Sequence, residues 1–334
     1  MFNVTAVIVT HNRLSLLKET IASVKWQTLQ PDKIIVIDNG SNDGSAEWLD
    51  AQSGLLVVHQ GNAGASGGFH SGINLAAQHN SDWIWVMDDD TICSENALEV
   101  LMAKAASIDE PVGFIGSKSL WTDGAPHAMN VPAIKPSFNG NIPFNKYDEL
   151  NVLLTETTSW VSLILNINAV REVGLPYKEF FIWSDDCEYT RRITQAGYLG
   201  CYCIDSVVVH KTPKNYNPNF YCDTVPNLWK HQHGFRNEFF LKKKYKGFVY
   251  YVFWLFAKVG YTSVKLISIR HTDRITFLSV LLRAAWNSLW FNPRIDQVHA
   301  ISGHRKNLVT LKNDKKLSAN KVIKQDNLQN EHLD

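Results

Sequence analysis

The sequence WIWVMDDDT, residues 83–91, places three adjacent aspartates directly after an apolar run with the composition of a buried strand. Carboxylates at the end of a buried strand repel one another and lose hydration, so a divalent cation or a hydrogen-bond network has to compensate them. We therefore predict a metal site at Asp88, Asp89 and Asp90. The alternative interpretation is a solvated turn that caps the next helix.

The first 90 residues alternate between strand-like and helix-like patterns. Strand patterns cover 4–9, 33–37 and 55–58, and a helical pattern covers 14–26. This alternation predicts an α/β fold with a mostly parallel central sheet flanked by helices. Such a sheet binds its ligands outside the carboxyl ends of its strands.

Polar residues follow each predicted strand and end in a glycine-rich loop, residues 61–72, before a short predicted helix at 73–78. Each strand end by itself is typical of a turn. Because all of them meet at one edge of a parallel sheet, together they favour a nucleotide site. The loop has neither the Rossmann nor the P-loop spacing, but its glycines would allow a ligand close to the backbone, and the following helix could face an anion. The residues assigned to this edge are Thr10, Asn12, Arg13, Asp38, Asn39, Asn62, Gly67 and Gly68.

A second acidic cluster lies in FFIWSDDCEY, residues 180–189. Acidic residues in the first turn of a helix are ordinary, because they complement the helix dipole. A carboxylate packed against Trp183 would nevertheless have a raised pKa, which suits a general base. Trp160, in a predicted strand at 157–167, could stack on a sugar ring or belong to the core, and His210, at the end of a strand, could be a metal ligand or structural.

Composition excludes several classes of protein. The chain has 33 Lys and Arg against 32 Asp and Glu, so its net charge gives no reason to expect nucleic-acid binding. Its five cysteines show no paired CxxC spacing, which favours a reducing cytosol over a disulfide framework and makes zinc unexpected. No signal peptide is recognised at the amino terminus.

The composition changes after about residue 225. A lysine-rich segment, 242–246, precedes the ten apolar residues 248–257, which are too few for a span of about 20. We expect this segment to lie on a membrane surface, and packing on the catalytic domain or on another subunit is the alternative. The predicted organisation is a catalytic domain at 1–225, a helical extension at 226–310 that docks on membrane or forms oligomers, and a polar, disordered tail at 311–334.

In combination, the motifs resemble the family 2 inverting glycosyltransferases of GT-A fold. The resemblance covers roughly residues 3–211 and rests on VIVTHNR (7–13), VIDNGSNDGS (36–45) and the aspartate triplet. The Gly-Gly-Phe core of 62–72 and WSDDCEY (183–189) followed by His210 are similar to the galactofuranosyltransferases. Those enzymes commonly have Trp-Asp-Asp, whereas here Ser184 separates Trp183 from Asp185.

The resemblance implies a role for each of these residues. Asp88, Asp90 and His210 would hold Mn²⁺ or Mg²⁺, with Asp89 near the ribose. Asp38 and Arg13 would bind the uridine and its diphosphate, and the other strand-end residues would complete the donor site. Asp186 would be the catalytic base, Asp185 and Glu188 would position the acceptor or the base, and Trp160 and Trp183 would contact the acceptor.

The expected activity is inverting transfer of galactofuranose from UDP-galactofuranose to a lipid-linked glycan in O-antigen, capsule or cell-wall galactan synthesis. The expected location is the cytoplasmic face of the cell membrane. Two alternatives remain open: a family 2 transferase for UDP-galactose, UDP-glucose or dTDP-rhamnose, or a non-catalytic module that binds nucleotide sugars.

Overall fold

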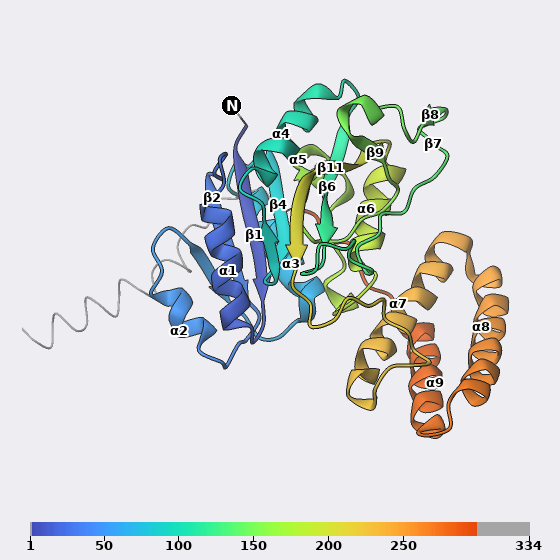
Figure 1. Cartoon of the computed structure of the whole chain (residues 1–334). Coiled ribbons are helices and arrows are strands. Elements are labelled where there is room, and N and C mark those ends of the chain that lie inside the picture. The colour runs from blue at the N-terminus through green and yellow to red at the C-terminus, as the bar shows by residue number, and fades with distance from the viewer. Residues whose placement is uncertain (1, 299–334) are drawn as a thin grey trace, which may run out of the picture. The chain divides into compact units, whose positions relative to one another are not determined.

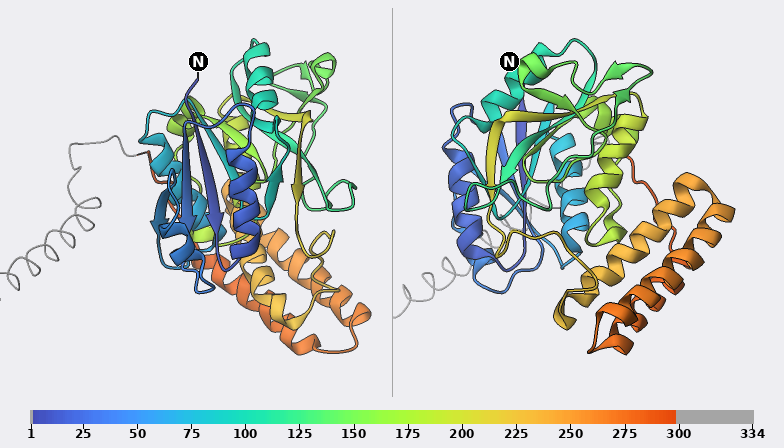
Figure 2. Two further views of the ribbon diagram at one scale, coloured as in Figure 1. Left: turned by 60° about the vertical axis from the view of Figure 1, so that its left-hand side comes forward. Right: turned by 45° about the vertical axis from the view of Figure 1, so that its right-hand side comes forward.

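The computed structural model describes residues 2–298. Its elements and their arrangement are shown in Figures 1 and 2. The predicted tail at 311–334 and residues 299–310 of the predicted extension lie outside the described residues.

The core is a mixed sheet that has nine strands within the described residues. Its strands are β1 (Val4–Thr10), β2 (Lys33–Asp38), β3 (Leu56–His59), β4 (Trp83–Asp88), β5 (Thr91–Cys93), β6 (Val112–Leu120), β9 (Val152–Leu154), β10 (Leu163–Asn166) and β11 (Leu199–His210). The order is β3-β2-β1-β4-β10-β6-β11-β5, and β9 pairs with β11. The first four strands in this order are parallel, whereas β10 runs antiparallel to β4 and β6. The predicted α/β architecture is confirmed, with more antiparallel pairing than the sequence indicated.

Helices cover both faces of the sheet because its strands alternate their side chains between the two faces. The helices are α1 (Leu14–Lys25), α2 (Ser45–Asp50), α3 (Gly64–Ala77), α4 (Ala97–Ser107), α5 (Ile167–Val173) and α6 (Asp185–Gln195). Ala6 and Ile8 of β1 belong to the core shared with α1 and α4. Val7 and Val9 belong to the core shared with α3, α5 and α6.

Helix α3 begins at Gly64, nine residues before the predicted start at 73, so most of the predicted glycine loop is helical. A Cβ atom at Gly68 would lie 2.4 Å from Val9 Cγ1, and one at Gly72 would lie 2.3 Å from Val7 Cγ1. These glycines therefore let the helix backbone pack closely on β1. The expectation that Gly67 and Gly68 admit a ligand is wrong, because both are buried against protein atoms.

The region at 121–151 contains a small hairpin of β7 (Ser137–Phe138) and β8 (Ile142–Pro143), followed by the 3₁₀ turn η1 (Asp148–Leu150). Two further 3₁₀ turns, η2 (Lys178–Phe180) and η3 (Val225–Asn227), precede α6 and α7. The predicted strand at 157–167 is shorter in the structure, where β10 begins only at Leu163.

Three long helices follow the sheet: α7 (Leu228–Lys246), α8 (Phe248–Ile269) and α9 (Arg274–Trp290). They pack on one another around a separate apolar cluster that includes Phe239, Tyr251 and Phe277 (Figure 1). The ten-residue apolar run is only the first half of α8, so the argument that it is too short to span a membrane is wrong. Judged by length and composition alone, α8 is long enough and apolar enough to cross a membrane, and it is the one such helix in the described residues.

Candidate active site

The aspartate triplet lies where the sequence placed it, at the carboxyl end of β4. The short strand β5 starts directly after the triplet and pairs antiparallel with the end of β11, opposing Thr91 to His210. This pairing brings an imidazole from more than a hundred residues away to the carboxylates. The sequence could not show this contact, because β5 has only three residues.

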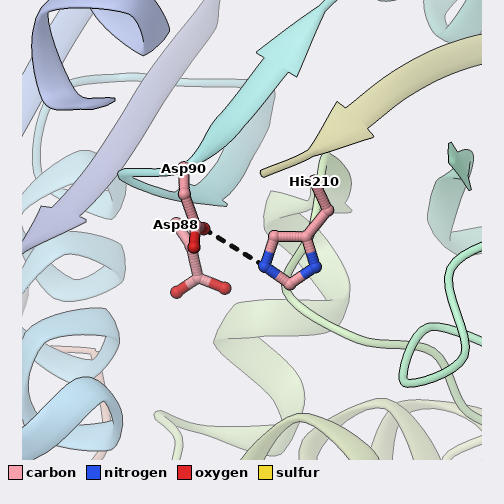
Figure 3. Close-up of side chains that lie close together, drawn as sticks. All are labelled: Asp88, Asp90 and His210. Atoms are coloured by element: carbon pink, nitrogen blue, oxygen red, sulfur yellow. Dashed lines mark ion pairs between the residues drawn. The ribbon is translucent and has the colours of Figure 1, made fainter. Parts of the chain in front are cut away.

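Asp88, Asp90 and His210 form a cluster that could hold a divalent ion (Figure 3). Their potential ligand atoms lie within 4.8 Å of one another. The Nε2 atom of His210 lies 3.1 Å from Asp90 Oδ1, a buried oxygen that makes no hydrogen bond of good geometry to any described residue. Two carboxylates and one imidazole suit a hard or borderline divalent ion, so this donor set fits a metal site.

Asn130 orients the imidazole, a role that no sequence pattern indicates. His210 Nδ1 lies 2.8 Å from Asn130 Oδ1, so Nδ1 donates a proton and Nε2 is left to face Asp90. Ligating histidines are commonly oriented by a hydrogen bond of this kind. The ring of His127 packs at 4.4 Å from that of His210 and covers its other side.

Arg13 is the main cation at the triplet. Its guanidinium donates to Asp90 and lies 3.5 Å from Asp89 Oδ1. Burial and the nearby Asp90 raise the pKa of Asp88 to about 7, with His210 opposing them. Burial alone would raise the pKa of Asp90, but the adjacent His210 and Arg13 bring it below its ordinary value. Electrostatically, then, the site is short of positive charge at Asp88.

Asp89 does not belong to the cluster of Asp88, Asp90 and His210 and is hydrogen-bonded to β1 instead. Its carboxylate accepts a hydrogen bond from the Thr10 hydroxyl at 2.7 Å and one from the His11 backbone at 3.3 Å. Burial raises the pKa of Asp89 to about 6, against the effect of Arg13. These hydrogen bonds connect the end of β4 to the end of β1, so Asp89 and Thr10 stabilise the fold. The predicted ribose contact of Asp89 has no support in this geometry.

The remaining donor-side residues divide into two groups. Asp38 and Asn39 are buried: Asp38 bonds the His59 ring at 2.8 Å, and Asn39 donates to the Gly64 carbonyl at 2.6 Å. The Asn39 prediction is corrected, because its amide also accepts from Gln60 and joins two loops. Asn12 and Asn62 are exposed beside His11, where each side-chain amide lies 3.3 Å from the imidazole, and they stay predictions for the donor.

The second acidic cluster begins helix α6 after a strained loop. Three residues of this loop have a positive φ: Phe181 at 66°, Trp183 at 65° and Ser184 at 70°. This left-handed region of backbone conformation is seldom adopted by residues other than glycine. Ser184, the extra residue between Trp183 and Asp185, is the N-cap of α6. Backbone strain of this kind persists only where the surrounding structure holds it, and it is common at functional sites.

Of the two aspartates in this cluster, Asp186 lines an open cavity and Asp185 does not. Burial and the adjacent Asp185 raise the pKa of Asp186 to about 7. No basic side chain among residues 2–298 pairs with Asp186, whose Oδ1 accepts only from the Cys187 backbone at 2.7 Å. Asp186 therefore has the environment expected of a general base.

Asp185 is buried and holds a tryptophan in place. It accepts a hydrogen bond from Trp160 Nε1 at 2.8 Å. The Trp160 ring is 4% exposed and stacks on Phe69 at 4.9 Å. The prediction that Trp160 stacks on a sugar is wrong, since no face of the ring is open, whereas Trp183 does line the cavity beside Asp186.

Glu188 is also misassigned. Its carboxylate is 0% exposed and is paired with Arg192 at 2.8 Å and Lys244 at 2.7 Å. The Tyr245 hydroxyl donates to the same carboxylate at 2.9 Å. Glu188 therefore joins α6 to α7 and cannot reach an acceptor or a base.

Asn237 of α7, which no sequence pattern singled out, holds the strained loop from the opposite side. Its Nδ2 atom lies 3.0 Å, 3.1 Å and 3.0 Å from the carbonyl oxygens of Phe180, Ile182 and Trp183. Gly234, one turn earlier, gives room for the Trp183 ring, because a Cβ there would lie 2.8 Å from Trp183 Cε3. Helix α7 thus fixes the segment that presents Asp186.

Comparison with known proteins gives the class that this geometry indicates. Residues 5–154 match the family described as "Glycosyl transferase family 2". The chain therefore carries a family 2 glycosyltransferase domain. A crystal structure of GalNAc-T7 with UDP, GalNAc and Mn²⁺ superposes with a TM-score of 0.50 at 17% identity, over 70% of this chain and 48% of that one. At that identity the likeness concerns the fold, which is GT-A, and this chain spans less than half of that structure.

Among curated proteins, the galactofuranosyltransferase GlfT1 of Mycobacterium tuberculosis is 26% identical over 234 residues, which is 62% of this chain and 70% of the relative. The O-antigen chain rhamnosyltransferase RfbN of Salmonella typhimurium is 24% identical over 217 residues, which is 64% of this chain and 68% of the relative. The chain is thus similar to transferases with different donor sugars.

We predict that Asn237→Leu lowers the rate of nucleotide-sugar turnover about 10- to 100-fold while leaving UDP affinity within about twofold, because a base that moves by about 1 Å loses rate and not donor binding. Steady-state kinetics and UDP calorimetry measure the two quantities. Asn287→Leu, an exposed amide on α9, is the matched control and should match the parent. A well-folded Asn237→Leu protein with the parent rate would show that the hydrogen bonds of Asn237 do not position Asp186.

Proposed function

We propose that the protein is an inverting, metal-dependent transferase that moves galactofuranose from UDP-galactofuranose to a lipid-linked glycan in surface polysaccharide synthesis. The observation that carries this proposal is the separation of two acidic groups with different environments. Asp88 and Asp90 at the end of β4 join a histidine in a metal-compatible cluster, whereas Asp186 faces a cavity and has no cationic partner in the described part of the chain. The cluster of Asp88, Asp90 and His210 would bind the metal at the leaving diphosphate, and Asp186 would remove the proton from the acceptor.

The proposed reaction is one displacement. The acceptor hydroxyl oxygen attacks the anomeric carbon, its proton passes to an Asp186 carboxylate oxygen, and the bond from the anomeric carbon to the UDP oxygen breaks as UDP departs. Attack from the side opposite the leaving group inverts the configuration, and no covalent intermediate is needed. A Mn²⁺ or Mg²⁺ ion bound by Asp88, Asp90 and His210 would neutralise charge on the departing diphosphate. Arg13 lies beside Asp90 and would supply further positive charge near the departing diphosphate.

The identity of the donor is proposed from the relatives. The similarity to the galactofuranosyltransferase GlfT1 favours a galactofuranose donor. The comparable similarity to the rhamnosyltransferase RfbN makes a rhamnose donor the second candidate. A non-catalytic binding module is disfavoured, since Asp186 and the complete metal-compatible cluster are both present. Turnover of UDP-galactofuranose, UDP-galactose, UDP-glucose and dTDP-rhamnose, compared in parallel, separates the candidates.

We predict that Asp186→Asn abolishes sugar transfer, by about 10³-fold or more, and leaves UDP binding near the parent value, because the amide cannot take a proton. In the parent, kcat should rise about tenfold per pH unit below about 7 and level off above it, since only deprotonated Asp186 accepts the proton. Stopped-time assays across pH, with calorimetry for UDP, measure both. Lost UDP binding in Asp186→Asn, or a rate independent of pH between 5 and 8, would refute the assignment.

We also propose that the α8 and α9 helices rest on the cytoplasmic membrane surface. Phe253 and Phe256 are 76% and 74% exposed, and Trp286 and Trp290 of α9 are exposed as well. Aromatic side chains of this kind favour the membrane interface. Part of the expected basic patch is occupied, because Lys244 binds Glu188 and Lys243 lies 3.3 Å from the Leu289 carbonyl. The apolar face therefore has to supply most of the binding.

The double variant Phe253→Ser with Phe256→Ser should bind vesicles containing anionic phospholipid at least about tenfold more weakly, because two exposed apolar side chains are lost. Co-sedimentation measures this. Trp26→Ser, which removes a tryptophan that is 78% exposed at the end of α1, is the control and should bind as the parent does. Equal binding by the double variant would remove the support for membrane docking through α8.

A further inference from the structure

A cavity of about 650 Å³ adjoins Asp186. It is lined by Trp183 and Asp186, by the loop at 217–221, and by residues of α7 and α8. Its volume is in the range of small-molecule sites, about 300–1,000 Å³. None of the roles assigned above explains why α8 lines it.

Helix α8 presents a polar stripe to this cavity. Lys258, Thr262 and Lys265 line it and are spaced i, i+4 and i+7, which places them on one face of the helix. Other faces of the same helix are apolar and exposed, as at Phe253 and Val264. Glu238 of α7 also lines the cavity and offsets Lys258, so within residues 2–298 Lys265 is the cation of the stripe that is free to meet a negatively charged ligand.

Two groups of the stripe lack the partners that protein atoms would normally supply. Lys265 Nζ lies over the rings of Tyr221 at 4.7 Å and Tyr261 at 5.7 Å, and no carboxylate among residues 2–298 pairs with it. The hydroxyl of Thr262, which is 1% exposed, makes no hydrogen bond to any described residue. A buried hydroxyl without a partner destabilises a fold, because its lost hydrogen bonds to water are not replaced. Lys258 is paired with Glu238 at 3.3 Å.

We propose that the stripe binds the phosphate linkage of a prenyl-linked acceptor, so that the acceptor sugar lies at Asp186 and Trp183. This inference rests on the proposed transferase function and adds the part of the acceptor that the chain recognises. An ammonium group and a hydroxyl donate hydrogen bonds that phosphate oxygens accept. The exposed apolar faces of α8 and α9 suit the attached hydrocarbon chain, which a free anion would not need.

Calorimetry with geranyl diphosphate as the probe tests the proposal. The full chain is first saturated with UDP and Mn²⁺, so that the probe cannot enter the donor site. We expect the parent to bind the probe, Lys265→Met to bind it about tenfold more weakly, and Lys265→Arg to bind near the parent value, because the lost contact is a charge-assisted hydrogen bond. Thr262→Val should also weaken binding, with little change in shape.

Lys246→Met is the matched control, because Lys246 ends α7, is exposed and does not line the cavity. It should bind geranyl diphosphate as the parent does. Equal affinity of the parent and Lys265→Met would overturn the proposal, as would pyrophosphate binding as tightly as geranyl diphosphate, which would indicate a free anion. Probe binding does not require turnover, so loss of transfer with intact probe binding would count against the proposed function alone.

Discussion

Three carboxylates at one strand end, two of them buried and Asp88 half-buried, create a deficit of positive charge, and the surrounding elements supply cations to offset it. Arg13 reaches the triplet from the end of β1, and His210 reaches it through the pairing of β5 with β11. The Thr10 hydroxyl donates a hydrogen bond to Asp89, and Asp88 and Asp90 are the carboxylates that lie near the imidazole. Because like charges in a buried setting are stable only with compensation, the Arg13 and His210 contacts and the proposed metal ion all offset the same negative charge.

The second constraint is the strained loop that presents Asp186. Three left-handed residues other than glycine would relax without support, and Asn237 supplies that support through three carbonyl oxygens. Glu188 adds an ion pair between α6 and α7. We therefore propose that α7 to α9 belong to the catalytic unit, although α7 begins close to the boundary predicted at 226. Their apolar and cationic faces would then bring the acceptor to the base.

Local patterns were enough to predict much of the fold. The strands β1, β2 and β4 and the helix α1 begin where the hydrophobic pattern placed them. The strands are buried on both faces and form continuous apolar runs, whereas the buried residues of α1 recur at helical spacing. Helix α3 was partly missed, since glycine is a weak helix former and only the close approach to Val7 and Val9 explains its presence there. Tertiary packing decided that element.

The site was predictable where its residues follow strands and not where distant helices complete it. Asp88 and His210 end strands and Asp90 lies in the turn after β4, so the topology brings the three together. The role of Glu188 was mispredicted because its partner Lys244 is 56 residues away. The choice between sugar stacking and a core position for Trp160 stayed open because its partners Phe69 and Asp185 come from other elements. Asn130 and Asn237 carry no local signal, since an asparagine that orients another group is identified only by what it contacts.

Anomalous diffraction from crystals grown with UDP and Mn²⁺ would locate the metal ion. We predict a manganese peak within about 2.0–2.3 Å of a carboxylate oxygen from Asp88 or Asp90 and of His210 Nε2, with the UDP diphosphate on its open side. A manganese peak elsewhere, or UDP bound with His210 still turned to Asp90 and no metal between them, would contradict it.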